Sequence, residues 1–207
     1  MLRTVLISIV GCVVCWRCGA ATLPTAQVDV ALYNDAGVSE GILRHAQEVA
    51  AEIYGKAGVA LLWNRCGRQV PDQVGDRHVC SRSDVLSIRI VAKSLSLRNE
   101  HFGVAFLGED GTGTQADVFH SGIEKLTQHD GSDEAVVLGH VIAHELGHLL
   151  LGMNAHSRAG IMQARWTNTE LREMRLGSLI FTDQEATAMR SRVSRESTVA
   201  GLRERRD

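Results

Sequence analysis

Two histidines and one glutamate within five residues have the types and the spacing to hold and use a metal ion. The segment reads His-Glu-Leu-Gly-His, so that His144 and His148 are four residues apart and Glu145 directly follows the first histidine. On a helix, this spacing places both imidazoles on one face, where their nitrogens can reach a single zinc ion at about 2.0–2.1 Å. Glu145 projects beside them without being a ligand, and its carboxylate can take a proton from water. The pattern indicates metal-assisted hydrolysis with Glu145 as the general base.

The residues around this motif predict a long, buried helix that begins at Ser132 or Asp133 and runs to Leu151. Apolar residues fill the positions between and beside the histidines, namely Val141, Ile142, Leu146, Leu149 and Leu150. Burying imidazoles without partners would be costly, and a metal ion supplies the missing partner. Gly152 can end the helix in the left-handed conformation.

A zinc site with an open coordination position for chemistry needs a third protein donor. His156 is the nearest candidate, since it follows the glycine-terminated turn, and Glu170 is the alternative, 22 residues after His148. We expect His156 to be the third ligand and Glu170 to be a solvated helix charge. His140, one turn before His144, is interpreted as a core residue or as a support for the ligands.

The segment from 144 to 162 resembles the metzincin clan of zinc peptidases, and its tail is similar to the matrixin branch. Metzincins continue the motif with a glycine, a third histidine and a methionine-containing turn. By this resemblance His156 is the third zinc ligand, and Gly160-Ile161-Met162 forms the Met-turn, with Met162 as an apolar floor under the metal. The spacer is longer here, because His156 lies eight residues after His148 where metzincins have six. No tyrosine follows the turn to match the one that some metzincins use.

Hydrophobic periodicity predicts the elements that must position these side chains. Strands are expected at 28–33, 59–63, 86–91, 104–107 and 116–119, and helices at 40–55, 133–151 and from 182 onward, where Thr182 to Glu185 has capping-box character. This order favours an α+β fold, and the resemblance implies a zincin-like twisted mixed sheet packed on an active-site helix and a C-terminal helix. It also implies that the strand near 116–120 forms the cleft rim, where a peptide substrate could add as an extra strand, and an ordinary hairpin is the alternative.

The N-terminal 21 residues have the pattern of a signal peptide. Arg3 precedes an apolar run that is too short to span a membrane, and small residues follow at Gly19, Ala20 and Ala21. We therefore expect an exported protein, whether secreted, periplasmic or at the cell surface, with a metallopeptidase domain over 22–195 and a flexible tail over 196–207. Lipid attachment at Cys12, within a lipoprotein-like Ile-Val-Gly-Cys box, is the alternative export route.

Two cysteines remain after removal of the signal, Cys66 and Cys80. In an exported domain, such a pair favours one disulfide that closes a short loop, and two buried free thiols are the alternative.

The net charge and the His-Glu-Leu-Gly-His motif together limit the functions that this protein could have. The net charge of −2 argues against a nucleic-acid binder, which would usually carry a basic surface. An exported zinc metalloendopeptidase acting on proteins or peptides is the leading hypothesis. A zinc-stabilised binding domain without turnover and a zinc amidase acting on cell-wall amides are the alternatives. Glu145 favours an enzyme, because a structural zinc site has no need of a base. The sequence does not indicate an oligomeric state.

Overall fold

The computed structural model describes residues 26–67, 79–93 and 101–203. The expected signal peptide and the Cys12 box lie outside these residues. The strands are β1 (Ala26–Asn34), β2 (Val59–Cys66), β3 (Leu86–Val91), β4 (Gly103–Phe106) and β5 (Gln115–Phe119). The helices are α1 (Glu40–Lys56), α3 (His120–Asp130), α4 (Glu134–Leu151), α5 (Asn168–Arg175) and α6 (Asp183–Arg203).

The five strands form one mixed sheet in the order β2-β1-β3-β5-β4. β1 pairs in parallel with β2 and β3, and β3 pairs in parallel with β5. β4 runs antiparallel to β5 and is an edge strand of the sheet, with Gly103 opposite Val118 and Phe106 opposite Gln115. The expected α+β fold with a mixed sheet, an active-site helix and a C-terminal helix is therefore confirmed.

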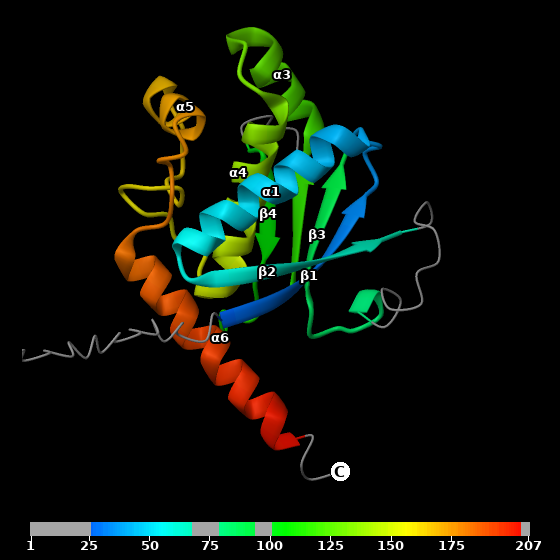
Figure 1. Ribbon diagram of the computed structural model, residues 1–207, viewed down its shortest axis with the longest axis vertical. Helices are drawn as coiled ribbons and strands as arrows, with labels where there is room; N and C mark the ends of the chain where they lie inside the picture. Colours follow the sequence, from blue (N-terminus) through cyan, green and yellow to red (C-terminus); the bar gives the residue numbers. More distant parts are fainter. Residues whose placement is uncertain (1–25, 68–78, 94–100, 204–207) are drawn as a thin grey trace, which may run out of the picture.

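One face of the sheet is covered by α1 and α4, which pack against each other (Figure 1). Alternate strand residues face this layer, and they join both helices in one core that includes Val30, Leu32, Ile88, Ile90, Ala116, Val118, Leu43, Ala46, Val141 and Ile142. Tyr54 of α1 is fully buried and donates a hydrogen bond to the carbonyl of Ala143 in α4 at 3.1 Å. This bond links the two helices one residue before the first histidine of the motif.

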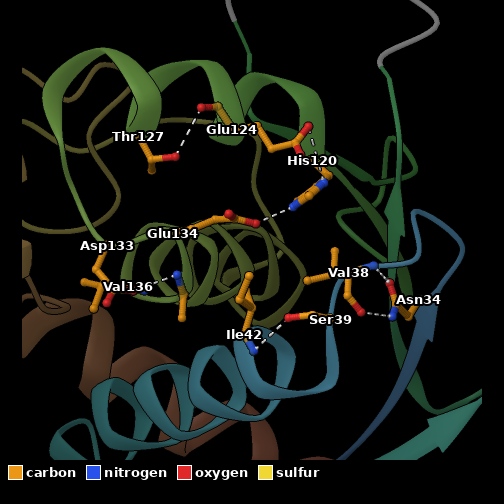
Figure 2. A network of polar contacts seen from close by, with 11 residues as sticks. Asn34, Val38, Ser39, Ile42, His120, Glu124, Thr127, Asp133, Glu134 and Val136 are labelled. Carbon is orange, nitrogen blue, oxygen red and sulfur yellow. Dashed lines mark hydrogen bonds and ion pairs between the residues drawn. The ribbon is translucent and has the colours of Figure 1, made fainter.

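The helix starts follow the capping residues in the sequence (Figure 2). The hydroxyl of Ser39 accepts from the Ile42 amide at the start of α1. Asp133 caps α4 by accepting from the amides of Ala135 and Val136 at 2.8 and 3.1 Å. These side chains satisfy amides that have no partner within the helix.

α3 is fastened to the start of the active-site helix by a side-chain contact that Figure 2 also shows. Nε2 of His120 lies 2.7 Å from a carboxylate oxygen of Glu134, and Nδ1 lies 3.7 Å from one of Glu124. His120 is the first residue of α3, Glu124 lies one turn further on, and Glu134 opens α4. The contact therefore joins consecutive helices where the chain turns between them.

A disulfide joins Cys66, the last residue of β2, to Cys80, as expected, across a separation of 14 residues. The pair lies in a small apolar cluster with Ala31 and Val85, apart from the main core. Tyr33 donates a hydrogen bond to the Cys80 carbonyl at 3.1 Å. The disulfide thus fastens the segment after β2 to the sheet.

Two expectations about the elements need correction. β5 is an interior strand between β3 and β4, so the edge is formed by β4 and not by the strand near 116–120. His120 begins α3, a helix that the periodicity did not predict. α6 continues to Arg203, into the stretch 196–207 that is expected to be a flexible tail.

Candidate metal centre and cleft

The active-site helix α4 is buried on almost every side, from Ala135 to Leu150. Among the described residues it is the one helix with the length and apolar composition of a membrane span, but 83% of that stretch is buried within the protein. A core helix of a globular domain has the same character. The helix ends where the sequence predicts, at Gly152 with φ +69°.

Three histidines converge at the C-terminal half of α4. His144 and His148 come from the helix, and His156 comes from the loop that follows it. Their candidate ligand nitrogens all lie within 4.8 Å of one another, and the Nε2 atoms of His144 and His148 are 3.1 Å apart. Nitrogens on a tetrahedral zinc ion would be about 3.3 Å apart. The three side chains thus form a group that could hold one metal ion despite the lengthened spacer.

The chain fixes which nitrogen of each helical histidine points at the shared site. Nδ1 of His144 donates to the Ile161 carbonyl at 2.8 Å, and Nδ1 of His148 donates to the Met153 carbonyl at 2.8 Å. A carbonyl can only accept, so each Nδ1 carries the proton and each Nε2 keeps its lone pair. This is the tautomer that a metal ligand needs, and the backbone bonds also set the orientation of each ring.

Desolvation favours the neutral form of the three imidazoles, of which two are buried and His156 is exposed. His144 and His148 are only 8% and 5% exposed. Desolvation lowers the pKa of His144 to about 4, and it also lowers the pKa values of His148 and His156. Metal ions bind the neutral form, so near pH 7 no proton has to leave these rings before an ion binds.

Glu145 lies beside the histidines but outside the group that could hold the ion. Its side chain is 5% exposed, and burial raises its pKa to about 8 in the metal-free protein. A strongly shifted pKa in a cleft is typical of functional groups. The four side chains border one cleft of about 970 Å³.

The walls of this cleft come from β4 and from the segment after Met162. All four residues of β4 line it, and so do Arg165 and Trp166. The Trp166 ring packs edge-on against His144, at 5.5 Å between centroids, and lies nearly parallel to the ring of Phe102 at 6.5 Å. Its indole N–H donates to the Ile161 carbonyl at 3.2 Å, the same oxygen that orients His144.

The segment proposed as the Met-turn lies beneath α4. Ile161 and Met162 are fully buried. A Cβ on Gly147 would lie 2.6 Å from the sulfur of Met162, so the helix approaches this turn through a glycine. Gly160 has φ +74°, and a Cβ there would lie 2.6 Å from the Ile180 carbonyl.

His156 is held in place through the next residue, Ser157. The Ser157 amide donates to the Met162 carbonyl at 2.8 Å, and its hydroxyl donates to the carboxylate of Glu185. Glu185 is buried and also accepts from the Thr182 amide at 2.8 Å, which completes the capping box expected at the start of α6. The third histidine is therefore tied both to the Met162 turn and to the C-terminal helix.

The other candidate ligands, His140 and Glu170, lie outside the three-histidine group. His140 is buried, and its Nδ1 lies 2.8 Å from the Val136 carbonyl, so it is a core residue outside the three-histidine group. Glu170 forms a capping box with Thr167 at the start of α5. One cleft residue was missed by the sequence reasoning. Gly103 lines the cleft but carries no signal in its type, because its role depends on the strand register.

No protein-family model matches this sequence, and no curated protein matches it either. The fold is similar to that of solved structures. One is a zinc-dependent peptidase from Methanocorpusculum labreanum (strain Z), with a TM-score of 0.52 and 15% identity, covering 77% of this chain and 99% of that one. Another is archaemetzincin from Methanopyrus kandleri, with a TM-score of 0.49 and 16% identity, covering 84% and 99%. At this identity the first similarity shows a shared fold.

Proposed function

We propose that this protein is an exported zinc-dependent metalloendopeptidase that hydrolyses peptide bonds with Glu145 as general base. One observation carries the proposal. Three neutral imidazoles converge while a buried carboxylate stands beside them without joining the group, and all four face one cleft. This separates the groups that hold a metal from the group that moves protons, which is the arrangement of a catalytic zinc site.

The donor set fits zinc. Imidazole nitrogens suit this ion, and three protein ligands leave a fourth position open for chemistry. In the described part of the chain the group that could hold a metal has three members, His144, His148 and His156. A structural site would usually fill all four positions with protein ligands, so the set favours the enzyme over a zinc-stabilised binding domain. We assign His156 as the third ligand and Met162 as the apolar floor beneath the site.

Zinc held there would supply a Lewis acid that polarises the peptide carbonyl and acidifies water. Glu145 takes the proton of the attacking water and then delivers it to the leaving amine as the C–N bond breaks. The hydrogen bonds from His144 to Ile161 and from His148 to Met153 hold the ligand rings still during this exchange. The nearly parallel rings of Trp166 and Phe102 form an apolar wall of the cleft beside His144.

The cleft suits an extended peptide. β4 lies at the sheet edge and lines the cleft along its full length, so a substrate could bind beside it as an additional strand. Phe102, Val104 and Phe106 offer apolar contacts along this rim. These features favour peptides over cell-wall amides as substrates. The similar structure from Methanocorpusculum labreanum is that of a zinc-dependent peptidase, which agrees with this assignment.

Export is proposed from the N-terminal pattern and is supported by the disulfide between Cys66 and Cys80, since disulfides persist in oxidising compartments. Expression of the full chain, followed by fractionation and mass spectrometry of its N-terminus, tests this part. A mature protein that begins shortly after Ala20 or Ala21 is expected. An unprocessed cytosolic chain would contradict export, and a lipid-modified Cys12 would redirect it to the lipoprotein route.

Peptidase activity is tested with processed protein loaded with one equivalent of zinc. The substrates are an unfolded protein and a pool of internally quenched peptides blocked at both ends, with cell-wall fragments as a parallel arm. Cleavage within the blocked peptides, abolished by a chelator and restored by zinc, is expected. Cleavage of cell-wall fragments alone would replace the peptidase with an amidase, and inertness toward every substrate at full zinc content would overturn the enzyme.

A further inference from the structure

Glu145 meets the edge strand at Gly103, and the contact leaves no room for a side chain. A Cβ built on Gly103 would lie 2.6 Å from both Cγ and Oε1 of Glu145, and 2.7 Å from Cδ. Real Cβ atoms essentially never come that close to another heavy atom. The glutamate side chain therefore occupies the space that any other residue at position 103 would fill.

We propose that Gly103 is the positioning residue for Glu145, and that its missing side chain holds the carboxylate beside the metal centre. This inference rests on the proposed function. It adds a residue that acts on the reacting groups only through Glu145. The clashing atoms belong to the end of a side chain, and not to backbone, so a larger residue would be accommodated by moving the carboxylate. The substitution would therefore displace the general base more than it would destabilise the fold.

The register of β4 decides that Gly103 is the residue at this point. Gly103 pairs with Val118 and Val104 with Asp117, and a shift of one residue would turn the Val104 side chain toward Glu145. The loop that joins β4 to β5 is also seated on the active-site helix, because a Cβ on Gly111 would lie 2.5 Å from the Gly152 carbonyl. The hairpin thus meets α4 at two points, one at the base and one at the helix end.

Gly103→Ala is the direct test, with Gly41→Ala as control, since Gly41 is exposed in α1 and a Cβ there meets nothing within 4 Å. We expect kcat on a blocked peptide to fall about 10- to 100-fold in G103A, because displacement of a catalytic group by about 1 Å costs rate on that scale. KM should change less than threefold, and zinc affinity less than twofold, because Glu145 is not a ligand. G41A should retain the kinetic constants of the wild type.

A double-mutant cycle with Glu145→Asp separates positioning from general damage, since aspartate is shorter by one methylene. G103A should lower kcat less than threefold in the E145D background. An equal loss in both backgrounds, or a loss confined to KM, would overturn the inference.

The contact can also be tested without turnover, so that failure of the proposed function would not decide it. In metal-free protein, G103A should lower the Tm by a few degrees when Glu145 is present and should leave it unchanged or raise it in the E145A background. The same Tm change in both backgrounds would contradict the contact between Gly103 and Glu145, whatever the enzymatic result.

Discussion

The sulfur of Met162 lies against the backbone of Gly147, 2.6 Å from where a Cβ on that glycine would stand. Gly147 is the residue before the second helical histidine, so the turn that carries Met162 packs directly beneath the two helical histidines. Phe181 approaches the same point, at 2.9 Å. The glycine of the motif is thus explained by packing against the Met162 turn.

Gly147→Ala is therefore expected to destabilise the protein by about 1–3 kcal/mol, because the added methyl overpacks a buried contact. It should also weaken zinc binding, since the Met162 turn carries the Ile161 carbonyl that orients His144. Chemical denaturation and a zinc titration against a chromophoric chelator measure the two effects. A variant as stable as the wild type, with the same zinc affinity, would refute the close packing of Met162 under the helix.

Ser157→Ala tests whether the C-terminal helix supports the third histidine. Loss of the bond between Ser157 and Glu185 frees the loop beside His156, and we expect zinc affinity to fall about 10-fold, as is typical when a support of a metal ligand is removed. His156→Ala should weaken zinc binding much further, and its effect is the reference for complete loss of this ligand. Ser191→Ala removes an exposed hydroxyl bond within α6 and serves as the control. Unchanged affinity in both S157A and H156A would remove His156 from the ligand set.

The metal-free protein should lose stability as pH rises from 6.5 to 8.5. The Glu145 pKa is about 8 in the folded state and near 4.5 when unfolded, so between these values the folded state holds a proton that the unfolded chain has released. Stability from this group therefore falls as pH rises, by about 2 kcal/mol over that range. The His144 pKa is lowered from 6.5 to about 4 in the folded state. This histidine therefore lowers stability only as pH falls below 6.5. Denaturation of metal-free wild type and Glu145→Gln at both pH values provides the measurement. A wild type that loses no more stability than E145Q would show that Glu145 is not buried as described.

Removal of the disulfide should be costly without touching the site. The bond between Cys66 and Cys80 closes a loop of 14 residues, and we expect a loss of about 3 kcal/mol in the double variant Cys66→Ser and Cys80→Ser. Zinc affinity should stay within twofold, since the pair lies in a separate cluster from the metal centre. A much smaller loss, matched by the reduced wild type, would mean that the loop contributes little to stability.

The strongly patterned elements could be predicted from the sequence, and the polar helices could not. Ser39 and Asp133 mark the starts of α1 and α4, and Gly152 marks the end of α4, because caps are local and chemical. α3 was missed because it begins without a side-chain cap and buries only Ile123 and Thr127. α5 was also missed, although its capping box at Thr167 is a signal of the same type as the one recognised at Thr182.

The site shows the same division between local and long-range information. The grouping of His144, Glu145 and His148 follows from one helical turn. The placement of His156 after a lengthened loop depends on Ser157, whose partners Met162 and Glu185 lie further along the chain. The edge position of β4 follows from strand order, which periodicity does not encode.

The most direct test of the central claim is Glu145→Gln, a change that keeps the side-chain shape and removes the base. We expect one zinc per chain in both wild type and variant, measured by elemental analysis. Hydrolysis of a blocked peptide should fall in the variant by about 10²–10⁴-fold, the range expected for loss of a general base. Wild-type protein without stoichiometric zinc, or a zinc-loaded variant that cleaves as fast as the wild type, would contradict the proposed zinc peptidase.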